Sequence, residues 1–416
     1  MAERLKVMFV DDQPEVAKNA ADQLPAHVRE VADVEVLNLD EVKVEVGTVF
    51  RRYRMFLDGK SFADVRTELP CRFDGVDILV LDYDLKNTSV GGEWASGLEV
   101  ARTARAFTTV RTLVLLNQFR SRSRFDLTMI EGATSLADID VPREQLANPG
   151  LWQAQGFKGF RPWEWPNLLT EAQRFEALRE WTSQNLDRPV LDALSLNAGL
   201  NEADQPARTM PREMWAIAMS EPTWTFRQMI EKAGFVPPLE AERLMKDADA
   251  APRAAAAVFA HWFERHVASG QEIFVDAAHL AHLAPWLLKD PQSKELRMSA
   301  CSLGPDAASV FVDEVAKHQL TPAILSSRPL FRYKEIQEAP ELSRPSGFSF
   351  SAVPDVVFCE DLSAFVDRKV ARPFPSLLPG TYSIRFVCDQ GQVIGKLAEV
   401  QDPRRVDYAP QSLFAL

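Results

Sequence analysis

Short apolar runs that end in aspartates alternate with helical patterns near the N-terminus, and this alternation constrains the fold more than any other feature. The run Leu5 to Val10 ends in Asp11 and Asp12, and the run Asp77 to Leu81 ends in Asp82. Continuous apolar runs of this length are typical of strands that are buried on both faces of a sheet. Because helical patterns separate the runs, the sequence predicts a doubly wound parallel sheet with helices on both of its faces.

The remaining elements of the N-terminal region are predicted from the same periodicities. We expect helices over 14–24 and 96–107 and further strands over 34–39 and 110–116. Residues 40–70 are rich in charge and lack a clear period, so we interpret them as an insertion. The alternation breaks again over 117–155, and regular structure is expected to return at 157–162.

The chain is too long for one ordinary domain, since it has 416 residues. We expect three regions: the α/β region 1–165, a mainly helical region 166–271 and an α+β region 272–416. The last region has strand-like segments, namely EIFVDA, PAILSS, DVVFCED, TYSIRFV and QVIGKLAEV. The last two of these flank Asp389-Gln390-Gly391, which is a typical hairpin turn.

The composition restricts the classes of function. The formal net charge is −12, so the surface repels nucleic acid and anionic membranes on average. Residues 225–246 could form two short helices, but they carry few basic side chains, so DNA binding is not favoured. The four cysteines form no CxxC pair, and no apolar stretch reaches the roughly 18–20 residues that span a bilayer. We therefore expect a cytoplasmic protein without a membrane segment.

Aspartates gather where the predicted strands end. In an open parallel sheet the carboxyl ends of the strands form the binding edge, so Asp11, Asp12 and Asp82 should lie close together. Grouped carboxylates repel one another unless a cation lies among them, and oxygen ligands are those that Mg²⁺ prefers. A carboxylate beside such an ion can attack a phosphoryl group and carry it as an aspartyl phosphate.

The motifs VMFVDDQPE and VDILVLDYDL, followed by Gly97-Leu98-Glu99-Val100, resemble the receiver domains of response regulators. The resemblance covers about residues 1–165 and implies a flavodoxin-like sheet. It implies that Asp82 is the phospho-acceptor and that Asp11 and Asp12, with the backbone carbonyl of Asp84, bind Mg²⁺. A sensor histidine kinase or another phosphodonor is the implied partner.

Two positions depart from the receiver pattern. Receivers end their fourth strand with Ser or Thr, and here the segment VLLNQF offers Asn117. Receivers end their fifth strand with Lys-Pro, and here GFRPW offers Arg161-Pro162, with Lys158 out of register. Arginine holds a phosphate through a planar fork and is not interchangeable with lysine. An atypical switch, or a domain that is never phosphorylated, is therefore an alternative.

The expected function is signalling in which a phosphoryl-accepting or phosphate-sensing receiver controls a C-terminal output or interaction module. Arg120, Arg122 and Arg124 border the surface that repacks in receivers, so we expect self-association or a protein partner there. Two alternatives remain open: a receiver-controlled hydrolase or nuclease in the C-terminal region, and a pseudo-receiver scaffold.

Two other sequence patterns offer weaker alternatives. LVLDYDL also resembles the DxD strand of haloacid-dehalogenase-like phosphatases, but Lys86 stands where that family has Thr, and a complete strand precedes it. The segment DAAHLAH places Asp276, His279 and His282 at helical spacing, which could form a metal site but is more typical of histidines at the edge of a core.

Overall fold

The computed structural model describes residues 4–85, 88, 96–116, 137–141, 143–152, 159–163, 165–195, 224–232, 238–268, 271, 273–374 and 385–388. The N-terminal elements are β1 (Leu5–Val10), α1 (Pro14–Asp22), α2 (Ala26–Val31), β2 (Ala32–Val36), α3 (Leu39–Leu57), α4 (Phe62–Glu68), β3 (Ile78–Asp82), α5 (Gly97–Phe107), β4 (Thr112–Leu116) and β5 (Ile139–Val141). The five strands are all parallel, in the order β2-β1-β3-β4-β5. The predicted parallel α/β sheet is thus confirmed.

Strand alternation divides the side chains of this sheet between two cores. Val7 and Phe9 of β1 face a core that includes α1 and the buried Trp152 and Trp165. Met8 and Val10 face the other core, which α3 and α5 cover. Successive strand residues point to opposite faces, so strands that are apolar at successive positions, as residues 7–10 are, must be covered on both sides.

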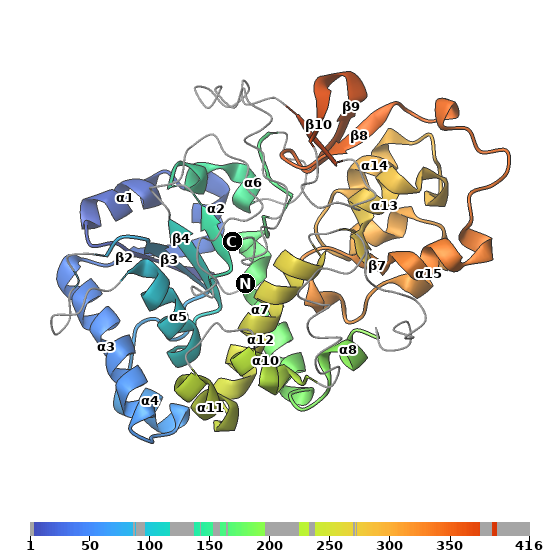
Figure 1. The fold of residues 1–416 in the computed structure, drawn as a ribbon. Helices are drawn as coiled ribbons and strands as arrows, with labels where there is room; N and C mark the ends of the chain where they lie inside the picture. Colours follow the sequence, from blue (N-terminus) through green and yellow to red (C-terminus); the bar gives the residue numbers. More distant parts are fainter. Residues whose placement is uncertain are drawn as a thin grey trace.

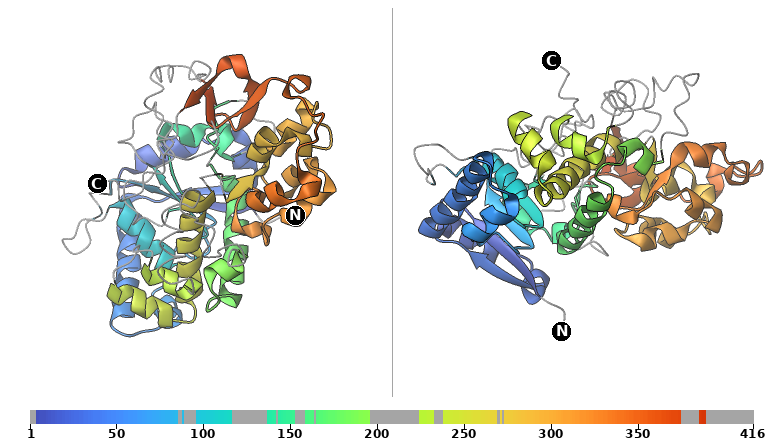
Figure 2. Two further views of the ribbon diagram at one scale, coloured as in Figure 1. Left: turned by 45° about the vertical axis from the view of Figure 1, so that its right-hand side comes forward. Right: turned by 90° about the horizontal axis from the view of Figure 1, so that it is seen from below.

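The middle of the chain is helical and lies between the sheet and the C-terminal region (Figure 1). Its elements, with the two short helices that precede it, are η2 (Arg143–Ala147), α6 (Pro149–Trp152), α7 (Leu168–Gln184), α8 (Val190–Ala193), α10 (Phe226–Lys232), α11 (Pro238–Lys246), α12 (Ala250–Trp262) and the π-helix η5 (Phe263–Ala268). Views from two further sides show the same succession of the three regions (Figure 2).

The helical region and the N-terminal region share one core. Phe56, Phe62 and Phe107, at the ends of α3, α4 and α5, belong to the same apolar cluster as α12. Polar contacts cross the same boundary: the N–H of Phe62 donates to Asp247 Oδ2 at 2.8 Å, and Arg243 Nη1 donates to the carbonyl of Phe56 at 2.7 Å. The helices are therefore packed against the sheet region along an interface that is both apolar and hydrogen-bonded.

The described part of the C-terminal region contains two small sheets. Its elements are β6 (Phe274–Asp276), α13 (Ala277–Leu283), η6 (Pro285–Leu287), α14 (Lys294–Ala300), η7 (Pro305–Val310), η8 (Asp313–His318), η9 (Ala323–Leu325), β7 (Leu330–Arg332), α15 (Tyr333–Glu338), η10 (Pro340–Leu342), η11 (Phe350–Ala352), β8 (Val356–Cys359), β9 (Ala364–Asp367), η12 (Arg368–Val370), β10 (Ala371–Phe374) and β11 (Arg385–Cys388). One sheet has the order β10-β11-β8-β9, and β6 pairs with β7 in the other.

Residues 40–70 differ from the prediction. They are not an irregular insertion, because α3 and α4 span most of them. Asn38 caps α3 in a capping box with Glu41, and Val42, Val46 and Val49 line its buried face. The alternation of charged and β-branched residues in KVEVGTVF hid this helical period. The second strand also begins and ends earlier than predicted, at Ala32 and Val36.

The fifth strand also lies elsewhere than predicted. It is β5, Ile139–Val141, and not the segment 157–162. Three residues are too few to show a period, which explains the error. In the C-terminal region, PAILSS forms the short helix η9 instead of a strand, while EIFVDA and DVVFCED contain β6 and β8 as predicted. The predicted turn 389–391 and the segment QVIGKLAEV lie outside the described residues.

Candidate functional site

Three aspartates meet at the carboxyl ends of β1 and β3. The two strands are adjacent and parallel, with Val10 opposite Leu81, so the residues that follow them lie at one edge of the sheet. Asp11, Asp12 and Asp82 are only 3%, 5% and 3% exposed, and each offers a carboxylate oxygen within 4.8 Å of the others. The predicted convergence of these side chains is confirmed. We call them the acidic cluster.

Backbone groups hold two of these carboxylates in place. The N–H of Gln13 donates to Asp11 Oδ1 at 2.8 Å, and the N–H of Asp84 donates to Asp82 Oδ2 at 3.1 Å. Each bond spans two residues, as in an Asx turn. Each leaves the second oxygen of the carboxylate to face other groups in the cluster.

Gly97 allows helix α5 to approach the end of β3. Its N–H donates to the carbonyl of Tyr83 at 2.8 Å, and Ser96 before it caps the helix in a capping box with Glu99. A Cβ atom at position 97 would lie 2.1 Å from the carbonyl oxygen of Asp82. Only glycine fits so close to a backbone, so the residue fixes the helix against the strand that carries Asp82.

Arg143 joins the two strands of the acidic cluster. It is the first residue of η2, two positions after the end of β5, and its Nη2 lies 3.0 Å from Asp11 Oδ2 and 2.9 Å from Asp82 Oδ1. The basic residue that follows the fifth strand is therefore Arg143 and not Arg161. Sequence reasoning missed it because β5 is so short. The available signal was the proline-arginine pair after Ile139–Val141.

The electrostatics of the cluster favour a cation. Burial, and next the charge of Asp11, raises the pKa of Asp82 to about 6, although Arg143 acts against this shift. Burial also raises the pKa of Asp11, with a contribution from Asp12. One guanidinium thus does not offset the cost of burying Asp11 and Asp82 so close together. Three carboxylate ligands at this spacing fit a hard divalent cation such as Mg²⁺.

Arg161 has other partners. Its Nε donates to the carbonyl of Gly150 at 2.9 Å, and its N–H donates to the carbonyl of Asp361 at 3.0 Å. It therefore connects α6 to the C-terminal region, and its predicted place after the fifth strand is wrong. The carbonyl of Asp84 as a metal ligand stays a prediction. Asn117, Arg120, Arg122 and Arg124 lie outside the described residues.

A second group of buried charges lies in the C-terminal region. His279 contacts Asp276 Oδ1 through Nδ1 at 3.0 Å and Glu360 Oε1 through Nε2 at 2.7 Å. Arg385 donates to both oxygens of Glu360, at 2.6 and 2.9 Å. The nearby carboxylates raise the pKa of His279 against its burial. Among the described residues, groups of three potential metal ligands occur only at the acidic cluster, so this network is interpreted as a structural one.

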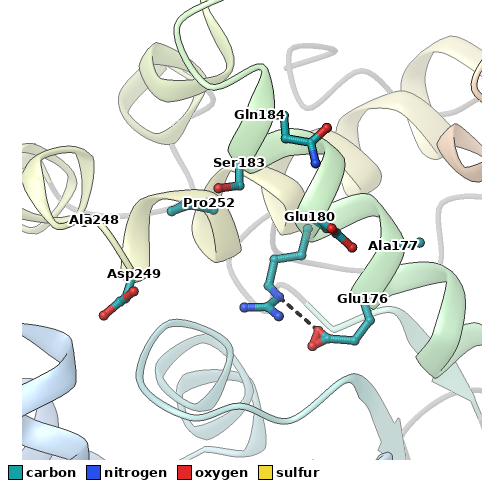
Figure 3. Close-up of a pocket in the computed structure, with 9 residues that line it drawn as sticks. Glu176, Ala177, Glu180, Ser183, Gln184, Ala248, Asp249 and Pro252 are labelled. Carbon is teal, nitrogen blue, oxygen red and sulfur yellow. Dashed lines mark hydrogen bonds and ion pairs between the residues drawn. The ribbon is translucent and has the colours of Figure 1, made fainter.

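A surface groove lies apart from both groups, between α7 and α12 (Figure 3). Its volume is about 600 Å³. The lining residues are Glu176, Ala177, Arg179, Glu180, Ser183, Gln184, Ala248, Asp249 and Pro252. Glu176 is paired with Arg179 one helical turn away at 2.9 Å. The groove lies in the helical region and not in the C-terminal region, so it does not bear on the hydrolase or nuclease alternative.

Comparison with known proteins gives no match: no protein-family model, no curated protein and no solved structure is similar to this chain at a significant level. Within the described part of the chain, no helix is both long enough and apolar enough to cross a membrane. The function must therefore be argued from the geometry of the acidic cluster.

Proposed function

We propose that the N-terminal region is a receiver-like domain that accepts a phosphoryl group on Asp82 and thereby controls the rest of the chain. The observation that carries this proposal is the position of Asp82, which is buried at the end of a central parallel strand and shares the contact of Arg143 with Asp11. The strand order β2-β1-β3-β4-β5 is that of flavodoxin-like sheets, whose ligands bind at this edge. A sensor histidine kinase or a small acyl phosphate is the proposed phosphodonor.

The chemistry requires one nucleophilic oxygen and one cationic partner. Asp82 Oδ1 forms a bond to the phosphorus, while the bond from phosphorus to the donor's nitrogen or oxygen breaks and its electron pair leaves with the donor. With a pKa of about 6, Asp82 is ionised at neutral pH yet more basic than an exposed aspartate. Arg143 lies beside this oxygen, so its guanidinium can leave Asp82 and turn to the oxygens of the phosphoryl group.

Asp11 and Asp12 are the residues that would hold Mg²⁺ together with Asp82. When bound, such an ion would supply positive charge that stabilises the phosphoryl oxygens. The chain's own contribution is to orient the carboxylates, which the backbone N–H groups of Gln13 and Asp84 do, and to exclude bulk water from them by burial.

Acetyl phosphate with Mg²⁺ should add one phosphoryl mass to the wild-type protein and none to Asp82→Ala. Mass spectrometry of the intact chain measures this directly. Asp22→Asn is the matched control, because Asp22 is an exposed aspartate at the end of α1 and should leave labelling unchanged. A wild-type protein that stays unlabelled, while a known receiver reacts in the same mixture, would argue against phosphoryl transfer.

Mg²⁺ should stabilise the folded protein by mass action. The expected gain is about 1.4 kcal/mol when the ion is present at ten times its dissociation constant. Asp12→Asn should remove most of this gain, since it deletes one carboxylate without changing the size of the side chain. Thermal unfolding with and without millimolar Mg²⁺ measures the effect. Identical curves for the wild type in both conditions would contradict an ion site at the acidic cluster.

A pseudo-receiver is the second candidate function. The observation in its favour is that Arg143 spans Asp11 and Asp82 and so supplies an internal cation. Such a domain would bind its partner without phosphorylation. The labelling experiment separates the two candidates, because a pseudo-receiver stays unlabelled.

A further inference from the structure

Arg143 is held only in part by its surroundings. Its Nη2 contacts both Asp11 and Asp82, but its Nε is buried and makes no hydrogen bond to any described residue. Its side chain is 28% exposed, whereas those of the two aspartates are 4% and 3% exposed. The guanidinium is therefore more exposed than the carboxylates that it contacts, and part of its hydrogen-bonding capacity is unused among the described residues.

Arg143 also begins a stretch of chain that runs to the C-terminal region. We call residues 143–152 and 159–163 the connector. Within it, Asn148 Nδ2 donates to Gln145 Oε1 at 2.9 Å and to the carbonyl of Phe160 at 2.7 Å. The Nε of Arg161 donates to the carbonyl of Gly150 at 2.9 Å. These bonds tie its two halves into one unit.

The far end of the connector is bonded to the C-terminal sheet. The N–H of Arg161 donates to the carbonyl of Asp361 at 3.0 Å, and the N–H of Trp163 donates to the carbonyl of Glu360 at 2.7 Å. Arg328 Nη2 donates to the carbonyl of Trp163 at 2.7 Å, and the indole N–H of Trp163 donates to Asp276. A displacement of the connector would therefore act directly on the residues after β8.

We propose that Arg143 is a displaceable internal counter-ion: a divalent cation at the acidic cluster expels it from Asp11 and Asp82, and its departure loosens the connector's bonds to Glu360 and Asp361. The physical reason is competition, because the cation and the guanidinium need the same carboxylate oxygens and repel each other at that distance. This inference rests on the proposed cation site of the receiver-like domain. It adds the route by which cation binding at that site would affect the C-terminal region.

Cation binding tests the competition. Isothermal titration of the full-length chain with Mn²⁺ and with Mg²⁺ should give an affinity about tenfold higher for Arg143→Gln than for the wild type, a typical size for coupled binding. Arg29→Gln, an exposed arginine on α2, should match the wild type. Equal affinities for the wild type and Arg143→Gln overturn the inference but leave the cation site intact. No binding by any of the three proteins overturns the proposed cation site itself.

Hydrogen exchange tests the route. In the wild type, saturating Mg²⁺ should speed the exchange of the amides of Arg161 and Trp163 several-fold, while the amide of Met8 in β1 stays unchanged. In Arg143→Gln the two connector amides should already exchange fast without the ion and should not respond to it. Unchanged exchange of both amides in a wild-type protein that binds Mg²⁺ would overturn the transmission through the connector.

Discussion

Replacing Arg174 by methionine should lower the free energy of unfolding by about 3–5 kcal/mol, the usual cost of removing one partner from a buried charge group. The Nε of Arg174 donates to both oxygens of Glu171, at 2.9 and 3.1 Å, and its Nη2 lies 3.1 Å from Glu264 Oε1. Its Nη1 donates to the carbonyl of Ile324 at 3.1 Å, which ties α7 to the C-terminal region.

The size of this effect follows from the carboxylates that Arg174 leaves behind. Glu171 is buried on α7, and Asp138 lies nearby at the start of β5, paired with Arg105. Burial raises the pKa of Glu264 to about 7 even with Arg174 present, and Glu171 and Asp138 add to the shift. Without Arg174, the buried carboxylates Glu171, Glu264 and Asp138 lack sufficient positive charge nearby. They must then either stay ionised at a cost in stability or take up protons.

Arg179→Met on the same helix is the matched control. Arg179 is half-exposed and pairs with Glu176 one turn away, so its loss should cost less than about 1 kcal/mol. Guanidinium unfolding of the two variants gives the comparison. Similar losses of unfolding free energy in Arg174→Met and Arg179→Met would show that the charges around Arg174 contribute no more to stability than a surface ion pair does.

Asp361→Asn should stabilise the protein more strongly as the pH rises from 4 to 8. Burial raises the pKa of Asp361 to about 8, and its Oδ1 accepts the N–H of Cys388 at 2.8 Å. The folded protein therefore keeps a proton that the unfolded chain releases above its ordinary pKa of 3.8. Wild-type stability must fall through this window, by at most about 1.4 kcal/mol per pH unit.

Asparagine is neutral at every pH and can still accept a hydrogen bond from the N–H of Cys388. The stability of the variant therefore lacks this dependence on pH. Unfolding free energies at pH 4, 6 and 8 measure the difference between the two proteins. Asp355→Asn is the control, because Asp355 is exposed and pairs with Arg368 at the surface. If the difference in unfolding free energy between the wild type and Asp361→Asn does not change with pH, Asp361 is already ionised in the folded protein.

The part of the site that the sequence predicted lies at the ends of two short apolar runs. Residues 7–10 of β1 and 78–81 of β3 are buried throughout, so they form hydrophobic segments whose ends identify Asp11, Asp12 and Asp82. The geometry of parallel strands then brings these residues together without further information.

The rest of the site depends on elements with no such signal. Arg143 follows a strand of three residues, and its contacts to Asp11 and Asp82 join positions far apart in the sequence. The Arg-Pro pair in the sequence favours Arg161 instead, because it resembles the Lys-Pro pair of receivers, although the partners of Arg161 are in α6 and after β8. Helix α3 was missed because packing against the sheet, and not local propensity, decides its conformation.

The core that α3, α4 and α5 share with α12 has a consequence for any attempt to divide the chain. A fragment that stops near residue 165 would present Phe56, Phe62 and Phe107 to water, since their neighbours in the cluster would be gone. Uncovered aromatic surface of this kind promotes aggregation. The N-terminal region thus cannot simply be cut out of the chain. Fusing it to another effector protein would require new apolar residues that pack against the ends of these helices.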